Sequence, residues 1–208
     1  MQILIKNIRS VEFDIIEKKE YVDEKRWENI QRMKSDADKK RSMASAFLLK
    51  AMCDRLQIEN PVYTYTENGK PYLVNNKNIA FNISHSGDYS MLAYLESSDS
   101  VGADIQQIRF MKDGMERRLL HEKEIMESQL LQEKKEYLNR IWVIKESYVK
   151  MTGEGLSHDF RDLYVDFENG KIEAGNRKPV YFWEQKWKED YILAVCTQMK
   201  IMPKPEEI

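Results

Sequence analysis

The sequence contains little cysteine, no long apolar run and no recognisable export signal. Its 208 residues include two cysteines, Cys53 and Cys196, and neither forms part of a CxxC pair. Both cysteines lie among apolar residues, which favours buried thiols in a reducing compartment. No apolar stretch approaches the roughly 20 residues of a membrane span. The N-terminal MQILIKNIRS lacks the pattern of a secretory signal, so we expect a cytoplasmic protein.

Neither sign of charge dominates the chain. Lys and Arg number 33 against 35 Asp and Glu, which gives a formal net charge of −2. Nucleic-acid-binding proteins usually carry a basic excess, so we expect no nucleic-acid partner. The chain has no P-loop or GxGxxG segment, so the common nucleotide-binding folds have no support. Hydrophobic residues make up 42% and aromatic residues 11%, which indicates a folded globular protein.

Hydrophobic periodicity predicts helices and strands in both halves of the chain. Alternating apolar and polar residues predict strands, and apolar stripes at i, i+3 and i+4 predict helices. Strands are expected at residues 2–8, 62–66, 79–83, 89–95, 101–108, 163–167, 180–184 and 191–197. Helical segments are expected around 27–33, at 35–56 and over 112–152, and the second part of the last segment runs from about 134 to 151. This order indicates an α+β fold, and the tail from residue 202 is expected to fray.

A weak internal repeat indicates that the two halves are alike. Asn68-Gly69-Lys70 recurs as Asn169-Gly170-Lys171, and Asp88-Tyr89 recurs as Asp190-Tyr191. We therefore expect two similar α+β lobes, an N-terminal one over residues 1–100 and a C-terminal one over 101–208.

One expected strand carries polar side chains on a single face. Alternate side chains of a strand point the same way, so Asp104 and Gln106 share one face. Their oxygen atoms could bind Mg²⁺, which often takes one or two carboxylates together with substrate phosphates and water. A half-exposed strand with a polar outer face explains the same pattern, and the segment alone leaves both interpretations open.

Two further segments allow a functional and a structural interpretation. Glu146 and Lys150 are neighbours at i, i+4 on an expected helix. They could form a surface ion pair, or they could belong to a functional site. Ser84 and His85 come where a strand is expected to enter a turn, a common place for ligand contacts. Adjacent residues of an extended segment point apart, which argues against a Ser–His nucleophilic pair.

Four segments, in this order and spacing, resemble the signature motifs of Sfp-type 4′-phosphopantetheinyl transferases. They are Gly69-Lys70-Pro71, Phe81-Asn82-Ile83-Ser84-His85-Ser86, Gly102-Ala103-Asp104-Ile105 and Trp142-(x2)-Lys145-Glu146-Ser147-(x2)-Lys150. The resemblance implies two similar α+β lobes with the active site in the cleft between them. Coenzyme A would bind there with Mg²⁺, or with Mn²⁺ in its place.

The resemblance also implies a role for each matching residue. The metal ligands would be Asp104, Gln106 and Glu146, and the catalytic residues Asp104, Glu146 and Lys150. The residues that correspond to coenzyme A contacts are Lys25, Arg41, Ser42, Gly69, Lys70, Pro71, Ser84, His85 and Lys150.

The implied reaction moves the 4′-phosphopantetheine group of coenzyme A to a serine of an apo acyl or peptidyl carrier protein. Adenosine 3′,5′-bisphosphate is released. Positioning and charge neutralisation dominate such a reaction. Lys150 would offset charge on the pyrophosphate, and Glu146 would accept the serine proton.

Gln106 departs from the family pattern, which usually has an acidic residue at this position. An amide offers an oxygen but no charge, so we expect weaker Mg²⁺ binding in the absence of coenzyme A. The departure leaves an alternative open, a catalytically silent relative that binds coenzyme A as a binding module. Phe110, Met111 and Met115 follow the metal-binding strand and could contact the carrier protein. We expect a monomer, because two lobes of one chain can form the cleft.

Overall fold

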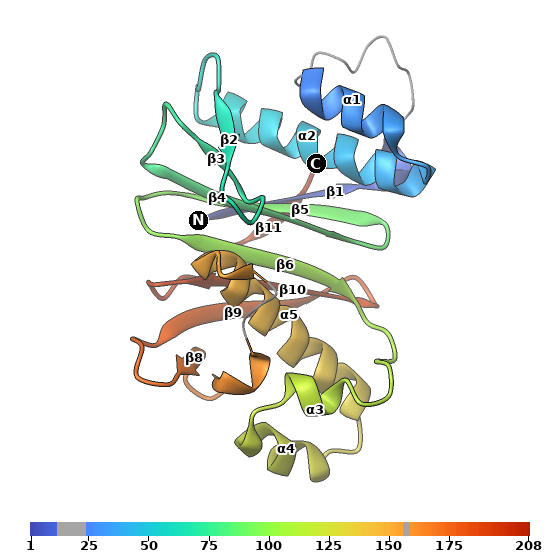
Figure 1. Ribbon diagram of the computed structural model, residues 1–208, viewed down its shortest axis with the longest axis vertical. Helices are drawn as coiled ribbons and strands as arrows, with labels where there is room; N and C mark the ends of the chain where they lie inside the picture. The colour runs from blue at the N-terminus through green and yellow to red at the C-terminus, as the bar shows by residue number, and fades with distance from the viewer. Residues whose placement is uncertain (12–23, 156–158) are drawn as a thin grey trace.

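The computed structural model describes residues 1–11, 24–155 and 159–208. The first half of the chain builds a sheet around three long strands, β1 (Gln2–Asn7), β4 (Ile79–Ser86) and β5 (Tyr89–Glu96). The order in this sheet is β11-β1-β5-β4, and β1 and β4 both run antiparallel to β5. The helix α2 (Asp36–Arg55) covers one face of the sheet (Figure 1).

The start and the apolar stripe of α2 follow from the sequence. Ser35 lies at the N-cap, where its side chain accepts a hydrogen bond from the Asp38 amide. Leu48 and Met52 lie one turn apart and pack against Leu4 of β1 and Leu92 of β5. The apolar face of α2 therefore buries the face of the first sheet that points away from the second sheet.

The second half builds a sheet of five strands in the order β6-β10-β9-β8-β7. Their bounds are β6 (Val101–Gln107), β7 (Leu163–Asp166), β8 (Lys171–Ala174), β9 (Val180–Trp187) and β10 (Tyr191–Thr197). The long helix α5 (Lys134–Thr152) packs on one face and ends at Gly153, whose φ of 76° gives the left-handed C-cap.

The two sheets pack against each other between the two long helices. Ile3 of β1 and Met91 of β5 share a buried cluster with Ala103 of β6 and Val195 of β10. The layers run α2, first sheet, second sheet, α5 (Figure 1). As a result, β4 and β6, which are edge strands of different sheets, lie next to each other, and α5 packs on β6.

Shorter elements complete the fold. They are η1 (Ile8–Ser10), α1 (Glu24–Arg32), the hairpin β2 (Tyr63–Tyr65) and β3 (Pro71–Leu73), α3 (Glu116–Leu119), α4 (Glu122–Gln129), η4 (Phe160–Asp162) and β11 (Pro205–Glu207). No helix within the described ranges is long and apolar enough to cross a membrane.

The expected helical segment 112–152 holds three separate helices, and α5 matches the second part expected at about 134–151. His121 caps α4, and residues 130–133 separate α4 from α5. Two other expectations about local structure are wrong. The C-terminal tail does not fray, since β11 pairs in parallel with β1 and Arg55 binds Glu206 with two hydrogen bonds of 2.8 Å. His85 and Ser86 belong to β4, and the turn begins at Gly87.

Candidate active site

A cavity of about 390 Å³ opens where β4, β6 and α5 meet. The side chains that line it are those of Ile83, Ser84, His85, Asp104, Ile105, Gln106, Trp142, Glu146 and Lys150. The cavity therefore brings together residues from three of the four motifs.

Gly102 allows β6 to lie directly on α5. A Cβ atom at this position would lie 1.9 Å from the carbonyl oxygen of Ser147 and 2.4 Å from the amide nitrogen of Met151. Glycine is thus the residue that permits this approach. Asp104, two residues further along the same face of β6, then points toward Glu146 and Lys150.

The face of β6 that carries Asp104 and Gln106 is covered rather than open to solvent. Asp104 is 5% exposed and Gln106 is 7% exposed, because α5 packs over them. The interpretation as a polar outer face of a half-exposed strand is therefore wrong. The opposite face, with Ala103 and Ile105, lies in the core between the sheets as expected.

Lys150 is bound to Asp104. Its ammonium group donates to Asp104 Oδ1 and, over 2.9 Å, to Ser84 Oγ. Ser84 Oγ in turn donates to Asp104 Oδ1 over 2.6 Å. Glu146 was the expected i, i+4 partner of Lys150, but the buried carboxylate of Asp104 takes that place. These three polar groups form one connected network at the cavity wall.

Glu146 has an unusual environment for a carboxylate. The residue is 9% exposed, and its Oε1 atom has no hydrogen-bond partner among the described residues. Burial raises the pKa of Glu146, and the negative charge of Asp104 raises it further, while Lys150 acts in the opposite direction. Such a group can accept a proton or a cation at little cost in reorganisation.

These residues form a donor set that suits Mg²⁺. Asp104 and Glu146 supply carboxylate oxygens, and Gln106 adds an amide whose nitrogen already donates to the Gln107 carbonyl over 2.8 Å. The amide oxygen of Gln106 is then the atom left for the cavity. The described residues contain no cluster of three or more His, Cys, Asp and Glu suited to a metal. Two carboxylates are enough for Mg²⁺ when substrate phosphates supply further ligands.

His85 lines this cavity, and Arg41 lies near enough to His85 to act on its charge. His85 is the exposed member of its lining, whereas Arg41 of α2 is partly buried. Arg41 donates to the Gly87 carbonyl over 3.0 Å and to Asp38 over 2.7 Å. Partial burial and the positive charges of Arg41 and Lys150 lower the pKa of His85. Asp38, the ion-pair partner of Arg41, acts on this pKa in the opposite direction.

The remaining residues expected at the nucleotide end do not line this cavity. Ser42 follows Arg41 on α2 and is partly buried, and Gly69 lies in the β2–β3 turn with a φ of 80°. Pro71 lines a second cavity, described below. Lys25 belongs to α1, but its side chain lies outside the described part of the structure.

Lys70 joins the two halves of the chain. Its ammonium group donates to the carbonyl oxygens of Val101 over 2.9 Å and of Lys150 over 2.8 Å. Burial lowers the pKa of Lys70 to about 8. The nearby Asn68 adds a bond of 2.6 Å to the Gly153 carbonyl. The β2–β3 turn is therefore held against β6 and the end of α5.

The depressed pKa of Lys70 predicts a pH-dependent stability. Between pH 8 and pH 10.5 the unfolded chain keeps this lysine protonated while the folded chain releases the proton, so stability rises with pH. We expect the free energy of unfolding of the wild-type chain, minus that of Lys70→Met, to increase by up to about 3 kcal/mol over this window. Urea unfolding at several pH values measures it. Exposed Lys178, changed to Met, is the control, and parallel curves for wild type and Lys70→Met would contradict the prediction.

Some residues at the site were not predicted as such. Trp142 lines the cavity and lies one turn before Glu146, so the spacing 142, 146 and 150 marks one helix face. Lys145, in the same motif, points the other way and is fully buried. It donates to Glu124 over 2.6 Å and to the Leu119 carbonyl over 2.8 Å, which holds α5 to the segment before it.

Two family models match the chain. One, described as the 4′-phosphopantetheinyl transferase superfamily, matches residues 100–196, and the other, described as 4′-phosphopantetheinyl transferase, N-terminal, matches residues 10–97. The chain belongs to the 4′-phosphopantetheinyl transferase family. The first match contains β6, α5 and β10, and the second contains α2 and β4, so the matches include every side of the cavity.

Individual relatives also carry the name of phosphopantetheinyl transferases. The chain is 29% identical to 4′-phosphopantetheinyl transferase ffp of Bacillus subtilis over 68% of this chain and 65% of that protein. It is 25% identical to 4′-phosphopantetheinyl transferase Sfp of Bacillus subtilis (strain 168) over 85% of this chain and 82% of that protein. The L-aminoadipate-semialdehyde dehydrogenase-phosphopantetheinyl transferase of Pongo abelii is 30% identical over 66% of this chain and 50% of its own. The match thus spans less than two thirds of the first and third of these relatives.

A solved structure also aligns with part of this family member. The Thermotoga maritima holo-[acyl-carrier-protein] synthase matches 47% of this chain and 61% of its own, at 22% identity and a TM-score of 0.36.

Proposed function

We propose that this protein transfers the 4′-phosphopantetheine group from coenzyme A to a serine of an apo carrier protein. The observation that carries the proposal is the meeting of Asp104, Glu146, Lys150 and Ser84 in one cavity of a chain from this family. In the same proposal the two halves of the chain are similar α+β lobes, residues 1–100 and 101–208. Both sides of the cavity come from one chain, which supports a monomer as the catalytic unit.

The chemistry requires one proton acceptor and neutralisation of phosphate charge. The serine oxygen forms a bond to the phosphorus that carries the pantetheine arm, and the bond from that phosphorus to the leaving bisphosphate breaks. Glu146 accepts the serine proton, a role suited to a carboxylate with an unpartnered buried oxygen. Lys150, held between Ser84 and Asp104, offers positive charge to the pyrophosphate.

Asp104, Gln106 and Glu146 would hold Mg²⁺, with Mn²⁺ as a substitute. When bound, this ion neutralises negative charge on the pyrophosphate. The two carboxylates repel each other in its absence, which is one cause of the raised pKa of Glu146. A cation bound by these carboxylates would reduce this repulsion.

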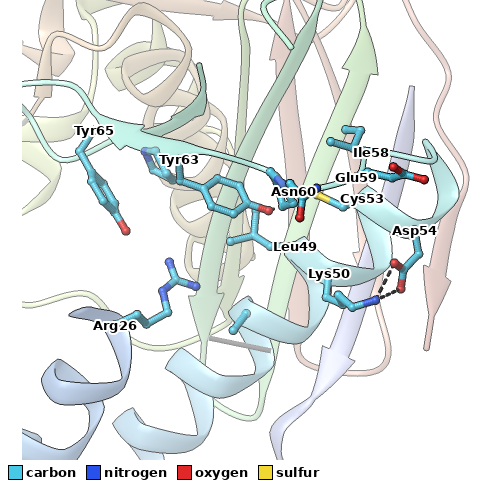
Figure 2. Close-up of a pocket in the computed structure, with 13 residues that line it drawn as sticks. Arg26, Leu49, Lys50, Cys53, Asp54, Ile58, Glu59, Asn60, Tyr63 and Tyr65 are labelled. Carbon is cyan, nitrogen blue, oxygen red and sulfur yellow. Dashed lines mark hydrogen bonds and ion pairs between the residues drawn. The ribbon is translucent and has the colours of Figure 1, made fainter. Parts of the chain in front are cut away.

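The nucleotide end of coenzyme A would extend from the cavity toward α2. His85, Arg41 and Ser42 supply polar groups along this path, in which Arg41 is the fixed positive charge. A second cavity of about 670 Å³ lies beyond them, between α1, α2 and β2, and Pro71 is part of its wall. Figure 2 shows Arg26 directed into it from α1, toward Tyr63 and Tyr65. This cavity has the size and the aromatic lining for a nucleoside.

The carrier protein would dock beside Phe110. Phe110 follows Gln106, the last expected metal ligand on β6, by four residues, and it is 83% exposed. The ammonium group of Lys135 lies over its ring, 4.4 Å from the ring centroid. Met111 and Met115 are only partly exposed, so Phe110 is the better contact of the three. Phe110 lines a hollow together with Lys112 and Lys134. The apolar ring and the two positive charges favour a partner with acidic and apolar side chains.

Phe110→Ser should raise the KM for the carrier protein by about tenfold, the usual cost of losing an aromatic contact. The affinity for coenzyme A should not change, because Phe110 does not line either cavity of the proposed coenzyme A site. Met126→Ser is the matched control, since Met126 is 62% exposed on α4. Equal carrier kinetics for both variants would place the carrier elsewhere.

Mass spectrometry of an apo carrier protein tests the proposed function. The carrier is incubated with this protein, coenzyme A and Mg²⁺, with Glu146→Gln as the control. A mass gain of one phosphopantetheine group, absent in the control, is the expected result. Coenzyme A binding with no gain on several acyl and peptidyl carriers, with Mg²⁺ or Mn²⁺, would instead identify a binding module.

A further inference from the structure

The strand β4 binds β6 through side chains rather than through a β-ladder. The two strands are the edges of different sheets, yet they lie side by side. Asn82, Ser84 and Ser86 alternate along β4 and therefore share one face. Asn82 Oδ1 accepts a hydrogen bond of 2.9 Å from the Ala103 amide, and Ser86 Oγ accepts one of 3.1 Å from the Gln107 amide.

These two bonds satisfy backbone groups that the fold would otherwise bury unpaired. An edge strand presents N–H groups that have no ladder partner, and a buried N–H without an acceptor is costly. Ala103 is fully buried and Asn82 is 4% exposed, so water does not replace the amide oxygen there. The side chains of β4 take the place of a neighbouring strand.

The same two bonds bracket the functional segment of β6. Ala103 directly precedes Asp104, and Gln107 directly follows Gln106. Ser84, between Asn82 and Ser86, donates to Asp104 itself over 2.6 Å. The position of the Asp104 and Gln106 side chains relative to β4 is therefore set at both ends and in the middle.

We propose that Asn82 and Ser86 are positioning residues, which fix the β6 backbone so that Asp104 and Gln106 meet Glu146 in one metal-binding geometry. The inference rests on the proposed function. Neither residue lines the cavity, so both act through β6. A binding site of this kind tolerates displacements of only about 0.5 Å. Partners that orient metal ligands typically change metal affinity by about 10- to 100-fold when they are removed.

The test compares Asn82→Leu, which keeps the size without the acceptor, with Ser86→Ala and Ser86→Thr. Binding of Mn²⁺ to the full-length protein with coenzyme A present is followed by electron paramagnetic resonance, with coenzyme A alone as the blank. Thr197→Val is the matched control, because Thr197 is 1% exposed and its hydroxyl makes two hydrogen bonds to Met199, away from the cavity. Urea unfolding of each variant measures the loss of stability separately.

We expect Asn82→Leu and Ser86→Ala to bind Mn²⁺ about 10- to 100-fold more weakly than the wild type. Ser86→Thr, which keeps the hydroxyl, should restore the affinity. The inference would be overturned if Asn82→Leu and Ser86→Ala bind Mn²⁺ with the affinity of the wild type. It would also be overturned if they lose no more affinity than Thr197→Val at equal stability. A wild-type protein that binds no Mn²⁺ would overturn it as well. If Mn²⁺ affinity falls as expected but no carrier is modified, the proposed function fails and the positioning role stands.

Discussion

Glu146→Gln is expected to lose about 10²- to 10⁴-fold in the rate of phosphopantetheine transfer, the usual contribution of a proton acceptor. The substitution keeps the shape of the side chain and removes only its charge and basicity. The same variant should be more stable than the wild type when no metal is present. Loss of activity with gain of stability is the mark of a residue kept for function.

The gain in stability follows from the raised pKa of Glu146. The folded chain holds the Glu146 proton more tightly than the unfolded chain, because ionisation there is opposed by burial and by Asp104. The contribution of the protonated form is complete below pH 4.5, the ordinary pKa of glutamate, and is lost as the pH rises through the folded pKa. Glutamine never ionises and keeps this contribution.

Urea unfolding in the presence of a chelator measures this difference. The midpoints of wild type and Glu146→Gln should approach each other at low pH and separate, in favour of the variant, as the pH rises to neutral. Glu173→Gln, at an exposed position on β8, is the matched control and should show no such separation. A Glu146→Gln protein that is less stable at neutral pH, or that transfers at the wild-type rate, would remove Glu146 from its proposed role.

The elements that carry the site could be predicted because their patterns are local. Alternation along residues 101–107 gives β6, and the capped apolar stripe after Ser35 gives α2. The end of α5 follows from Gly153. In contrast, no local pattern shows that the polar face of β6 lies under a helix, because only the packing of α5 against Gly102 covers it.

The pairing of side chains across the site was harder to predict. Helical spacing made Glu146 the natural partner of Lys150, but a buried carboxylate 46 positions earlier binds the lysine instead. In the same way, Lys70 has the sequence context of an exposed turn lysine, yet it is partly buried and donates to carbonyls of β6 and α5. Both contacts join distant parts of the chain, so they depend on the packing of the two sheets and not on either segment alone.

Gly102→Ala tests how strongly the site depends on the close approach of β6 and α5. A Cβ atom at residue 102 would lie within 3 Å of backbone atoms of Ser147 and Met151. Backbone atoms of a helix cannot turn aside as a flexible side chain does, so the strand and the helix must separate. Glu146 directly precedes Ser147 on α5, and Asp104 lies two residues beyond Gly102 on β6. The separation therefore widens the distance between the two carboxylates of the proposed site.

We expect Gly102→Ala to lose about 3 kcal/mol in the free energy of unfolding, at the upper end of the usual cost of overpacking. Transfer by the folded fraction should fall by about 100-fold, the typical result of misplacing reacting groups by an ångström. Urea unfolding and the carrier assay measure the two effects. Gly175→Ala makes the same chemical change where an added Cβ meets nothing within 4 Å, and it carries only the strain of a φ of 56°. If Gly102→Ala is as stable and as active as Gly175→Ala, the contact between β6 and α5 is not what holds Asp104 opposite Glu146.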